Sequence, residues 1–472
     1  MRILLPTGEI AYPVVKEAAE RFGADVAVAG KIAAFITPKK LFEMLSGNKE
    51  KYDLVIVSGM CTADFSGVED EFGIPVYLGP RHAADLGLIL GYIDELELSR
   101  VIPADELIAS KKKEEAYSKI RETEESSNPD FLIGGIRIGG GSRMKVLAEI
   151  MDAHKALNLR EVVFEFIESG ADIIDLGFGF DATPDDVKRT FEEVADIKTV
   201  FAADTQDPEL IRAALGYADL ILSLHEGNIP VVGEEVAEAG TAAVVVPNEN
   251  NLEENLRMAE EIGIEKIIAD PLLQPAGSGL IPSLSGFHRC GHPLFFGAGN
   301  VVELIDADSP GANALLAALA MEAGASIVFT SEHSDKTRGS VREMRRACDM
   351  MALASNRPYP KDLGIDLFCI KEKRRRRELP LSYSVCDKTE EIGDELEFDP
   401  AGNIRIGIED GYIVVVHKER AIKGKKWEEI FHMLLKEERV SLMDHAAYLG
   451  KELYKAELAL KFNRSYEQDG PF

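Results

Sequence analysis

The feature that most constrains this chain is a series of eight short apolar segments between residues 131 and 329. Strands that are buried on both faces, as in parallel sheets, are apolar at consecutive positions rather than at alternating ones. Helix-like stretches lie between most of these segments, and eight strand–helix units within about 215 residues predict a (β/α)8 barrel. The eight predicted strands are residues 131–138, 173–176, 200–203, 220–224, 242–246, 267–269, 294–296 and 327–329.

The main competing fold is an open, doubly wound parallel sheet. Sheets of that kind that bind dinucleotides carry a G-x-G-x-x-G turn, whose glycines let the backbone approach the pyrophosphate. Residues 134–141 do not give this pattern, and residues 297–302 have Val302 where the third glycine would stand. The chain also has no G-x-x-x-x-G-K-[ST] loop, so the barrel is the favoured interpretation.

Three further regions flank the predicted barrel, which we assign to residues 130–345. Residues 1–107 alternate short apolar strands with helical stretches, which predicts a small N-terminal α/β domain. Residues 108–129 are highly charged, which is typical of an exposed helix followed by a linker. Residues 378–472 contain a predicted hairpin and two helices, which indicates a small C-terminal α+β domain. The basic run at residues 371–378 is interpreted as a solvated linker rather than as a phosphate or RNA site.

Charge and cysteine content exclude several classes of function. With 53 Lys and Arg residues against 82 Asp and Glu residues, the net charge is −29, which argues against nucleic acid or an anionic membrane as a partner. No apolar run approaches the length of about 18 residues that a membrane-spanning helix needs, and the first residues do not resemble a signal peptide, so we expect a cytoplasmic protein. The five cysteines are scattered, and His288, Cys290 and His292 form at most half of a metal site, so we predict no bound metal.

Polar side chains end most of the predicted barrel strands. Active sites of such barrels lie at the carboxyl ends of the strands, where this chain has Asp175, Asp204, Ser223, Asp270 and Asn300. Buried carboxylates without partners are costly, and a ligand with paired N–H donors would satisfy them. A carboxylate can accept two parallel N–H bonds, and the amine edge of a 2-amino-4-oxopyrimidine presents such a pair. The alternatives are that Asp204 and Asp270 cap the helices that follow them and that Asn300 is a turn residue.

Cationic groups follow the first and the eighth predicted strands. Arg137 and Arg143 flank a glycine-rich loop that could bind phosphate at a helix N-terminus, although a tight turn is the favoured interpretation of the loop. His333, Lys336 and Arg338 follow the last strand. These are the groups from which a site for an anionic substrate would have to be built.

Three segments at strand ends resemble a known family, the pterin-binding barrels of dihydropteroate synthases and methyltetrahydrofolate–corrinoid methyltransferases. Residues 170–177 (GADIIDLG), 203–205 (ADT) and 268–271 (IADP) are similar to the second, third and sixth strands of that family. The whole chain, including residues 445–460 (HAAYLGKELYKAELAL), resembles archaeal dihydropteroate-synthase-related proteins. The resemblance implies a reduced pterin as substrate or cofactor, in one-carbon metabolism of the tetrahydromethanopterin or folate type.

The resemblance also implies roles for individual residues. Asp175, Asp204, Ser223, Asp270 and Asn300 would bind the pterin, with the asparagine close to its N5 atom. The residues implied for catalysis are Asn300, Lys336 and Arg338, and those for phosphate or a second substrate are Arg137, Arg143 and His333.

Several positions depart from the synthase pattern. The first loop lacks Asn-x-Thr-x-Asp, and Gly299-Asn300-Val301 stands where synthases have Ser-Arg-Lys. The eighth strand has Ser331, not arginine, two residues before His333. These differences bring the site closer to the methyltransferase branch of the family.

Three functions therefore remain open at this stage. A synthase-like enzyme would condense a pterin diphosphate with a nucleophile, would need cations for the leaving group, and would use Mg²⁺. A methyltransferase would pass a methyl group from a methyl-tetrahydropterin to a thiol or to a corrinoid on a partner protein. The third possible function is that of a non-catalytic, pterin-binding assembly subunit. The sequence leaves open whether the chain forms a homodimer.

Overall fold

The structure is a computed structural model, and it describes residues 1–47, 52–287, 291–355, 359–361, 363–370, 384–386 and 398–470. The chain divides into two compact units, residues 1–381 and residues 382–472. Each unit is described by itself below. The basic run at 371–378 and the pair His288 and Cys290 lie outside the described residues.

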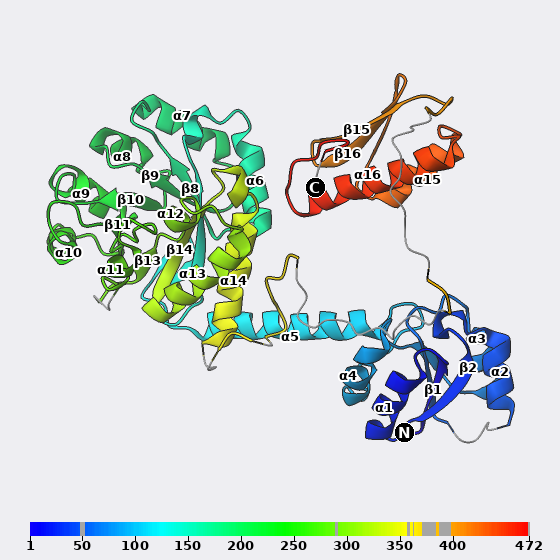
Figure 1. Ribbon diagram of the computed structural model, residues 1–472. Helices are drawn as coiled ribbons and strands as arrows, with labels where there is room; N and C mark the ends of the chain where they lie inside the picture. Colours follow the sequence, from blue (N-terminus) through cyan, green and yellow to red (C-terminus); the bar gives the residue numbers. More distant parts are fainter. Residues whose placement is uncertain are drawn as a thin grey trace. The chain divides into compact units, whose positions relative to one another are not determined.

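A closed barrel of eight parallel strands forms the centre of the first unit (Figure 1). The ring closes where β14 pairs with β7. The strands are β7 (Lys145–Ile150), β8 (Ile173–Gly177), β9 (Val200–Asp204), β10 (Leu220–Leu224), β11 (Ala242–Val245), β12 (Ile267–Ala269), β13 (Leu294–Phe296) and β14 (Ala325–Ser331). The predicted (β/α)8 barrel is confirmed, and seven of its strands lie where the apolar segments predicted them.

Helices follow the strands and cover the outside of the barrel (Figure 1). They are α6 (Leu159–Ser169), α7 (Pro184–Val194), α8 (Pro208–Ala214), α9 (Ile229–Ala239), α10 (Leu252–Glu261), α11 (Leu280–Leu284), α12 (Gly299–Val302), α13 (Ser309–Ala323) and α14 (Ser340–Ala354). Short 3-10 helices in this unit are η1 (Ala33–Phe35), η2 (Ala83–Asp85), η3 (Ala153–Lys155) and η4 (Asp335–Thr337).

The prediction of the first barrel strand is wrong. Residues 131–138 form a separate antiparallel hairpin, β5 (Phe131–Ile133) and β6 (Ile136–Ile138), and the barrel begins only at β7. Gly134 and Gly135 have φ angles of +53° and +90°, so the segment turns back on itself instead of continuing as one strand.

The hairpin lies at the amino ends of the barrel strands. Gly134 packs closely against Val200, the first residue of β9, and Gly139 packs against Pro293, just before β13. Ile133 and Ile138 are buried among the side chains that fill the barrel interior. The glycine-rich loop is therefore a turn at the end of the barrel opposite the expected active site.

The wrong first strand also affects Arg137 and Arg143, which were predicted to bind phosphate or a second substrate. Arg143 lies just before β7 and forms a two-pronged pair with Asp172, at 2.8 and 2.5 Å, at the amino ends of the strands. Arg137 is on the hairpin and donates to the carbonyl of Ser127 at 2.9 Å. Neither arginine reaches the carboxyl ends of the strands, because the strand that was expected to place them there does not exist.

Asp172 is the centre of a charged network inside the protein. Besides Arg143, it accepts hydrogen bonds from Arg345 at 3.3 Å and from the backbone N–H of Val146 at 2.9 Å. Burial by itself would raise the pKa of Asp172, but the Arg143 and Arg345 guanidiniums outweigh it and hold that pKa below its ordinary value. The network ties the starts of β7 and β8 to α14.

The N-terminal part of the first unit is a four-stranded parallel sheet with the order β2-β1-β3-β4, as the strand–helix alternation predicted. Its strands are β1 (Ile3–Gly8), β2 (Asp25–Gly30), β3 (Leu54–Val57) and β4 (Val76–Leu78). Its helices are α1 (Tyr12–Phe22), α2 (Pro38–Ser46), α3 (Ser66–Phe72) and α4 (Leu86–Gly91). The charged segment that follows is the 23-residue helix α5 (Ala104–Ser126).

The second unit is a small α+β fold, as predicted. An antiparallel sheet of β15 (Ile404–Glu409), β16 (Tyr412–His417) and β17 (Arg420–Gly424) packs its apolar face on α15 (Trp427–Lys436) and α16 (Met443–Lys461). Its first turn uses Asp410 and Gly411, both with positive φ angles, in agreement with the expected hairpin.

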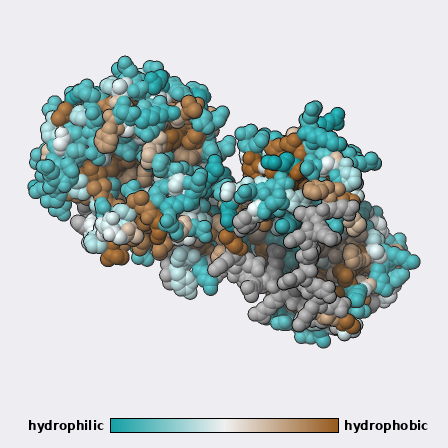
Figure 2. Space-filling model, turned by 45° about the horizontal axis from the view of Figure 1, so that its top comes forward, coloured by the Kyte–Doolittle hydropathy of each residue, from teal (hydrophilic) through white to brown (hydrophobic). Residues whose placement is uncertain are grey.

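Hydrophilic side chains cover much of the face shown in Figure 2. Among the described residues, the structure contains no helix with the length and apolar content needed to span a membrane.

The network around Asp172 leads to a stability prediction. Replacing Asp172 by Asn leaves the Arg143 guanidinium without its paired carboxylate and leaves Arg345 with Asp349 alone, so we expect a loss of about 3–5 kcal/mol in the free energy of unfolding. The matched control is Asp196→Asn, which removes an exposed pair with Arg160 and should cost about 0–1 kcal/mol. Calorimetric unfolding of both variants checks this, and equal losses would contradict the assigned role.

Candidate functional site at the mouth of the barrel

A layer of carboxyl groups lies directly above the apolar interior of the barrel. Side chains on a strand alternate between its two faces, and Leu147, Ile173, Ala202 and Ile268 face the interior. Two residues further along the same strands come the acidic residues Glu149, Asp175, Asp204 and Asp270. All four therefore face inward, at or near the carboxyl ends of their strands, which we call the mouth of the barrel.

Asp175 has the least compensated environment of the four. Its side chain is completely buried, and neither carboxylate oxygen has a hydrogen-bond partner among the described residues. Strand pairing places it opposite Glu149 on β7. A buried ionised group without partners is costly, so this position requires either a proton or a ligand.

Crowding and burial raise the pKa values of the whole layer. Burial, followed by the neighbouring Asp204 and Glu149 carboxyl groups, raises the pKa of Asp175 well above its ordinary value. Burial also raises the pKa of Asp204 to about 6 and that of Asp270 to about 7. Burial and then the Asp204 charge raise the pKa of Glu149 to about 7. Glu149, Asp204 and Asp270 therefore exchange protons close to neutral pH, as acid–base groups in active sites do.

The helix-capping alternative does not fit the two later aspartates. Helix α8 is capped by Asp207, which accepts hydrogen bonds from the N–H groups of Glu209 and Leu210 at 2.8 and 3.3 Å. Asp270 accepts the N–H of Leu272 at 2.8 Å within a loop, and α11 begins ten residues further on, at Leu280. Both carboxyl groups remain oriented by their strands.

A cavity of about 640 Å³ opens at this mouth, between the ends of β7, β8, β9 and β10. This volume is in the range of pockets that bind small ligands. Among the described residues, its lining contains four carboxyl groups, one imidazole and two phenyl rings, but no lysine or arginine. The lining residues are Glu149, Asp152, Asp204, Asp207, His225, Phe178 and Phe180, with Met151, Gly177, Gly179, Ala182, Thr205, Gln206 and Leu210.

The other predicted pterin-binding residues lie close to this cavity or further around the ring. Asp204 lines the cavity, whereas Asp270 is buried directly after β12, three strands further along the barrel. Ser223 is buried at the end of β10, and its hydroxyl accepts a hydrogen bond of 3.4 Å from Gln206. Asn300 is exposed in α12, just after β13, where its amide lies against Gly297.

The loop after β14 carries the remaining predicted cations. Glu303 organises it by accepting hydrogen bonds from the backbone N–H of His333 at 2.9 Å and from the hydroxyl of Thr337 at 2.6 Å. Lys336 donates to the carbonyl of Ile305 at 2.8 Å and pairs with Asp306. His333 and Arg338 are exposed. None of the three predicted cations lines the cavity.

Sequence reasoning missed Glu149, Asp152 and Glu303. The first two were missed because the first strand was placed at residues 131–138. Strand β7 (KVLAEI) begins with Lys145 and has a glutamate at its fifth position, so a search for uninterrupted apolar runs passes over it. The signal that could have revealed this strand is the set of β-forming residues in 145–150, between the glycine-rich loop and the next helix.

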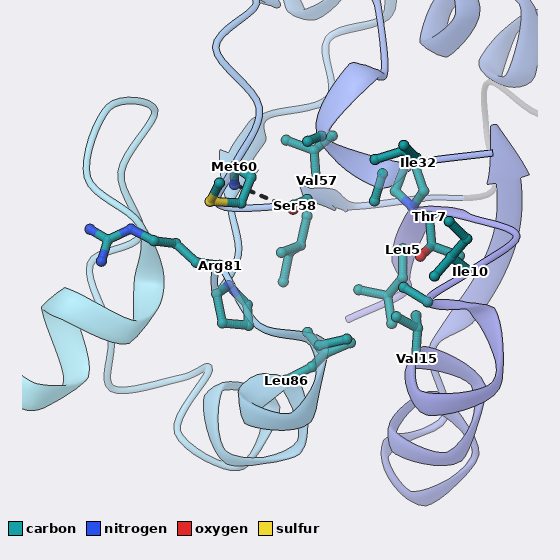
Figure 3. Close-up of a pocket in the computed structure, with 17 residues that line it drawn as sticks. Leu5, Thr7, Ile10, Val15, Ile32, Val57, Ser58, Met60, Arg81 and Leu86 are labelled. Atoms are coloured by element: carbon teal, nitrogen blue, oxygen red, sulfur yellow. Dashed lines mark hydrogen bonds between the residues drawn. The ribbon is translucent and has the colours of Figure 1, made fainter. Parts of the chain in front are cut away.

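The N-terminal domain has a second cavity, of about 290 Å³, which the sequence did not predict (Figure 3). It lies at the carboxyl ends of β1 and β3, where neighbouring strands connect in opposite directions and ligands of α/β sheets often bind. Its lining is mostly apolar, including Leu5, Val15 and Leu86, with few polar groups. The acidic mouth of the barrel therefore offers the richer chemistry and is the candidate functional site.

The raised pKa of Glu149 leads to a prediction on pH. Between pH 4.5, its ordinary value, and about 7, the unfolded chain has lost a proton that the folded protein keeps. Stability should therefore fall as the pH rises through this range, and Glu149→Gln should remove part of the fall, on the order of 2–3 kcal/mol. Thermal unfolding between about pH 5 and 8 tests this, with the exposed Glu168→Gln as the control. Parallel curves for wild type and Glu149→Gln would contradict it.

Comparisons with known proteins found a family model that matches part of the second unit and a relative that matches nearly the whole chain. A family model described as PterinBD-DUF4346 matches residues 398–469 in the second unit. The uncharacterized protein MJ0107 of Methanocaldococcus jannaschii is 37% identical over 520 aligned positions, which cover 99% of this chain and 98% of that protein.

Solved structures with a similar fold include two dihydropteroate synthases. The enzyme from Thermus thermophilus in complex with 6HMPPP is 20% identical, with a TM-score of 0.35, and covers 44% of this chain and 92% of that one. The Yersinia pestis enzyme with a pterine-sulfa conjugate is 20% identical, with a TM-score of 0.36. The match covers 44% of this chain and 93% of that one. The chain belongs to the same family as MJ0107 of Methanocaldococcus jannaschii.

Proposed function

We propose that the mouth of the barrel binds a reduced pterin and that the protein transfers a group to or from it. The observation that carries this proposal is the inward-facing carboxyl layer, above all Asp175, which is fully buried without a hydrogen-bond partner among the described residues. A ligand with several N–H donors on one edge would provide what this layer lacks.

The amine edge of a pterin has the required chemistry. Its N3–H and 2-amino group point in the same direction and can donate two parallel hydrogen bonds to one carboxylate. Each such charge-assisted bond contributes about 1.5–3 kcal/mol. We assign this contact to Asp204 and Asp270, with Asp175 behind them and Ser223 at the neighbouring strand end. The aromatic rings of Phe178 and Phe180 line the cavity and offer flat apolar contact for the heterocycle.

The charge of the cavity favours methyl transfer over diphosphate chemistry. Departure of a diphosphate requires cations at the leaving group, and the described cavity lining provides carboxyl groups instead. In methyl transfer, the bond between N5 and the methyl carbon breaks as a thiolate or a reduced cobalt attacks that carbon, and N5 takes up a proton. Glu149, whose pKa is raised to about 7, is suited to supply this proton, with Asn300 oriented toward N5.

Two other functions remain as alternatives. A synthase-like condensation would have to recruit Lys336 and Arg338 from the loop after β14, and Mg²⁺ with the diphosphate. A non-catalytic subunit that holds a pterin for a corrinoid protein or another partner would use the same binding edge without the proton donor. We place all three within one-carbon metabolism of the tetrahydromethanopterin or folate type.

The binding step is tested by replacing one carboxylate. Asp270→Asn keeps the shape of the side chain but replaces an acceptor by a donor, so affinity for a reduced pterin should fall at least tenfold. Thermal unfolding should stay unchanged or rise, because a costly buried carboxyl group is removed. Calorimetric titration measures the affinity, and Asp185→Asn, on the exposed first turn of α7, is the matched control. Equal affinity in both variants would exclude this carboxylate from the contact.

The reaction is tested with two donors side by side. We expect turnover of a methyl-tetrahydropterin with a thiol or corrinoid acceptor, and none of a hydroxymethyldihydropterin diphosphate with an arylamine. Lys336→Ala and Arg338→Ala should then leave methyl transfer largely unchanged. Turnover of the diphosphate that both variants reduce would establish the synthase alternative, and pterin binding without turnover of either donor would favour the assembly subunit.

A further inference from the structure

Three potential metal ligands converge beside the cavity, on the loops that follow β7 and β8. Asp152 and His154 belong to the turn around η3, and Asp181 follows β8. One ligand atom of each residue lies within 4.8 Å of the other two. Asp152 also lines the 640 Å³ cavity, so the cluster borders the proposed substrate site.

The histidine is the second, independent observation. Its side chain is only 6% exposed, and its Nε2 atom lies 3.9 Å from the Asp181 carboxylate. Neither ring nitrogen has a hydrogen-bond partner among the described residues. A buried imidazole normally has a partner on at least one nitrogen, so this ring is oriented toward a group that the protein itself does not supply.

The surroundings allow the two carboxylates to approach each other. Gly179 lies between them, and a Cβ atom there would be 2.5 Å from Asp152 Oδ1 and 3.2 Å from Asp181 Oδ1. Lys155, which is half exposed, places its ammonium 2.9 Å from Asp181 and 3.5 Å from Asp152. The site thus already attracts one cation, and the Lys155 ammonium makes no hydrogen bond to either imidazole nitrogen.

We propose that Asp152, His154 and Asp181 bind a divalent first-row transition-metal cation, with Zn²⁺ as the reference ion, at the rim of the barrel cavity. An imidazole nitrogen with two carboxylates is a ligand set for such ions, whereas Mg²⁺ prefers oxygen ligands alone. Ligand atoms around a tetrahedral Zn²⁺ lie about 3.4 Å apart, so atoms spaced up to 4.8 Å apart have to approach by about 1.4 Å. Departure of the exposed Lys155 side chain permits this movement.

Three protein ligands leave at least one coordination position open. Since Asp152 belongs to both the cluster and the cavity lining, the ion would lie where a second substrate enters. It would supply the positive charge that the described cavity lining lacks. This inference does not depend on the identity of the pterin and holds or fails without it.

The test is calorimetric titration of the metal-stripped full-length chain, without a histidine tag, with Zn²⁺, Mn²⁺ and Mg²⁺ and without pterin. We expect one Zn²⁺ per chain at this site, bound more tightly than Mg²⁺. Asp181→Asn and His154→Gln should each weaken Zn²⁺ binding at least tenfold. Lys155→Met should tighten it at least threefold, because the competing ammonium is gone. Asp185→Asn, an exposed carboxylate on the adjacent helix, should change nothing.

Asp185→Asn removes the same charge as Asp181→Asn, so a loss of Zn²⁺ binding in Asp181→Asn alone distinguishes a metal site from a general loss of negative charge. Asp181 is exposed, so its variant keeps the test valid if the buried His154→Gln variant unfolds. Co²⁺ provides a second measurement, since its visible absorption should reveal a nitrogen ligand that is lost in His154→Gln. Equal Zn²⁺ binding by wild type and Asp181→Asn would overturn the proposal, as would a preference for Mg²⁺.

Discussion

Strand β8 connects two buried carboxylates with opposite environments, and this contrast underlies the whole barrel. Asp172, just before the strand, is paired with two arginines and has a lowered pKa. Asp175, three residues later, is fully buried without a partner among the described residues, and its pKa is raised. The first arrangement stabilises the amino end of the barrel. The second is costly for folding, and a fold tolerates such a cost where a ligand or a proton compensates it.

The position of the apolar side chains explains why the buried carboxyl groups without partners lie at the carboxyl ends of the strands. The interior is filled by residues such as Leu147, Ile173 and Ile268, and the hairpin residues Ile133 and Ile138 close it at the amino ends. Above this level the same faces of the strands continue with acidic residues, and the cavity begins there. Closed parallel barrels have this polarity in general, because the loops that follow the strands can vary while the packed interior cannot.

The barrel was predictable from the sequence because seven of its strands are buried on both faces and mostly apolar. Strand β7 was not predictable in this way, because it begins with Lys145 and has Glu149 near its other end. Lys145 is fully buried by contacts with Glu124 and the carbonyl of Arg143, which no local pattern reveals. Because β7 was not recognised, Arg137 and Arg143 were expected at the carboxyl ends of the strands instead of the amino ends. For the same reason, Glu149 and Asp152 were not identified as site residues.

Residues at strand ends were easier to predict than their grouping. Asp175 and Asp204 follow apolar runs directly, so their inward orientation follows from alternation alone. That Asp204 lines the cavity while Asp270 lies three strands away depends on the order of strands around the closed ring. The convergence of His154 with Asp181 depends on two loop conformations, which sequence patterns do not determine.

Proton exchange connects the carboxyl layer to the kind of ligand that it can hold. Without a ligand, Glu149, Asp204 and Asp270 have pKa values raised to about 7, 6 and 7, so they are partly protonated near neutral pH. A ligand edge made of N–H donors interacts best with the ionised form, and its binding must therefore displace protons from this layer. A ligand with acceptors on that edge would retain them. In the proposed pterin complex, the carboxyl layer would therefore favour a ligand whose edge carries N–H donors.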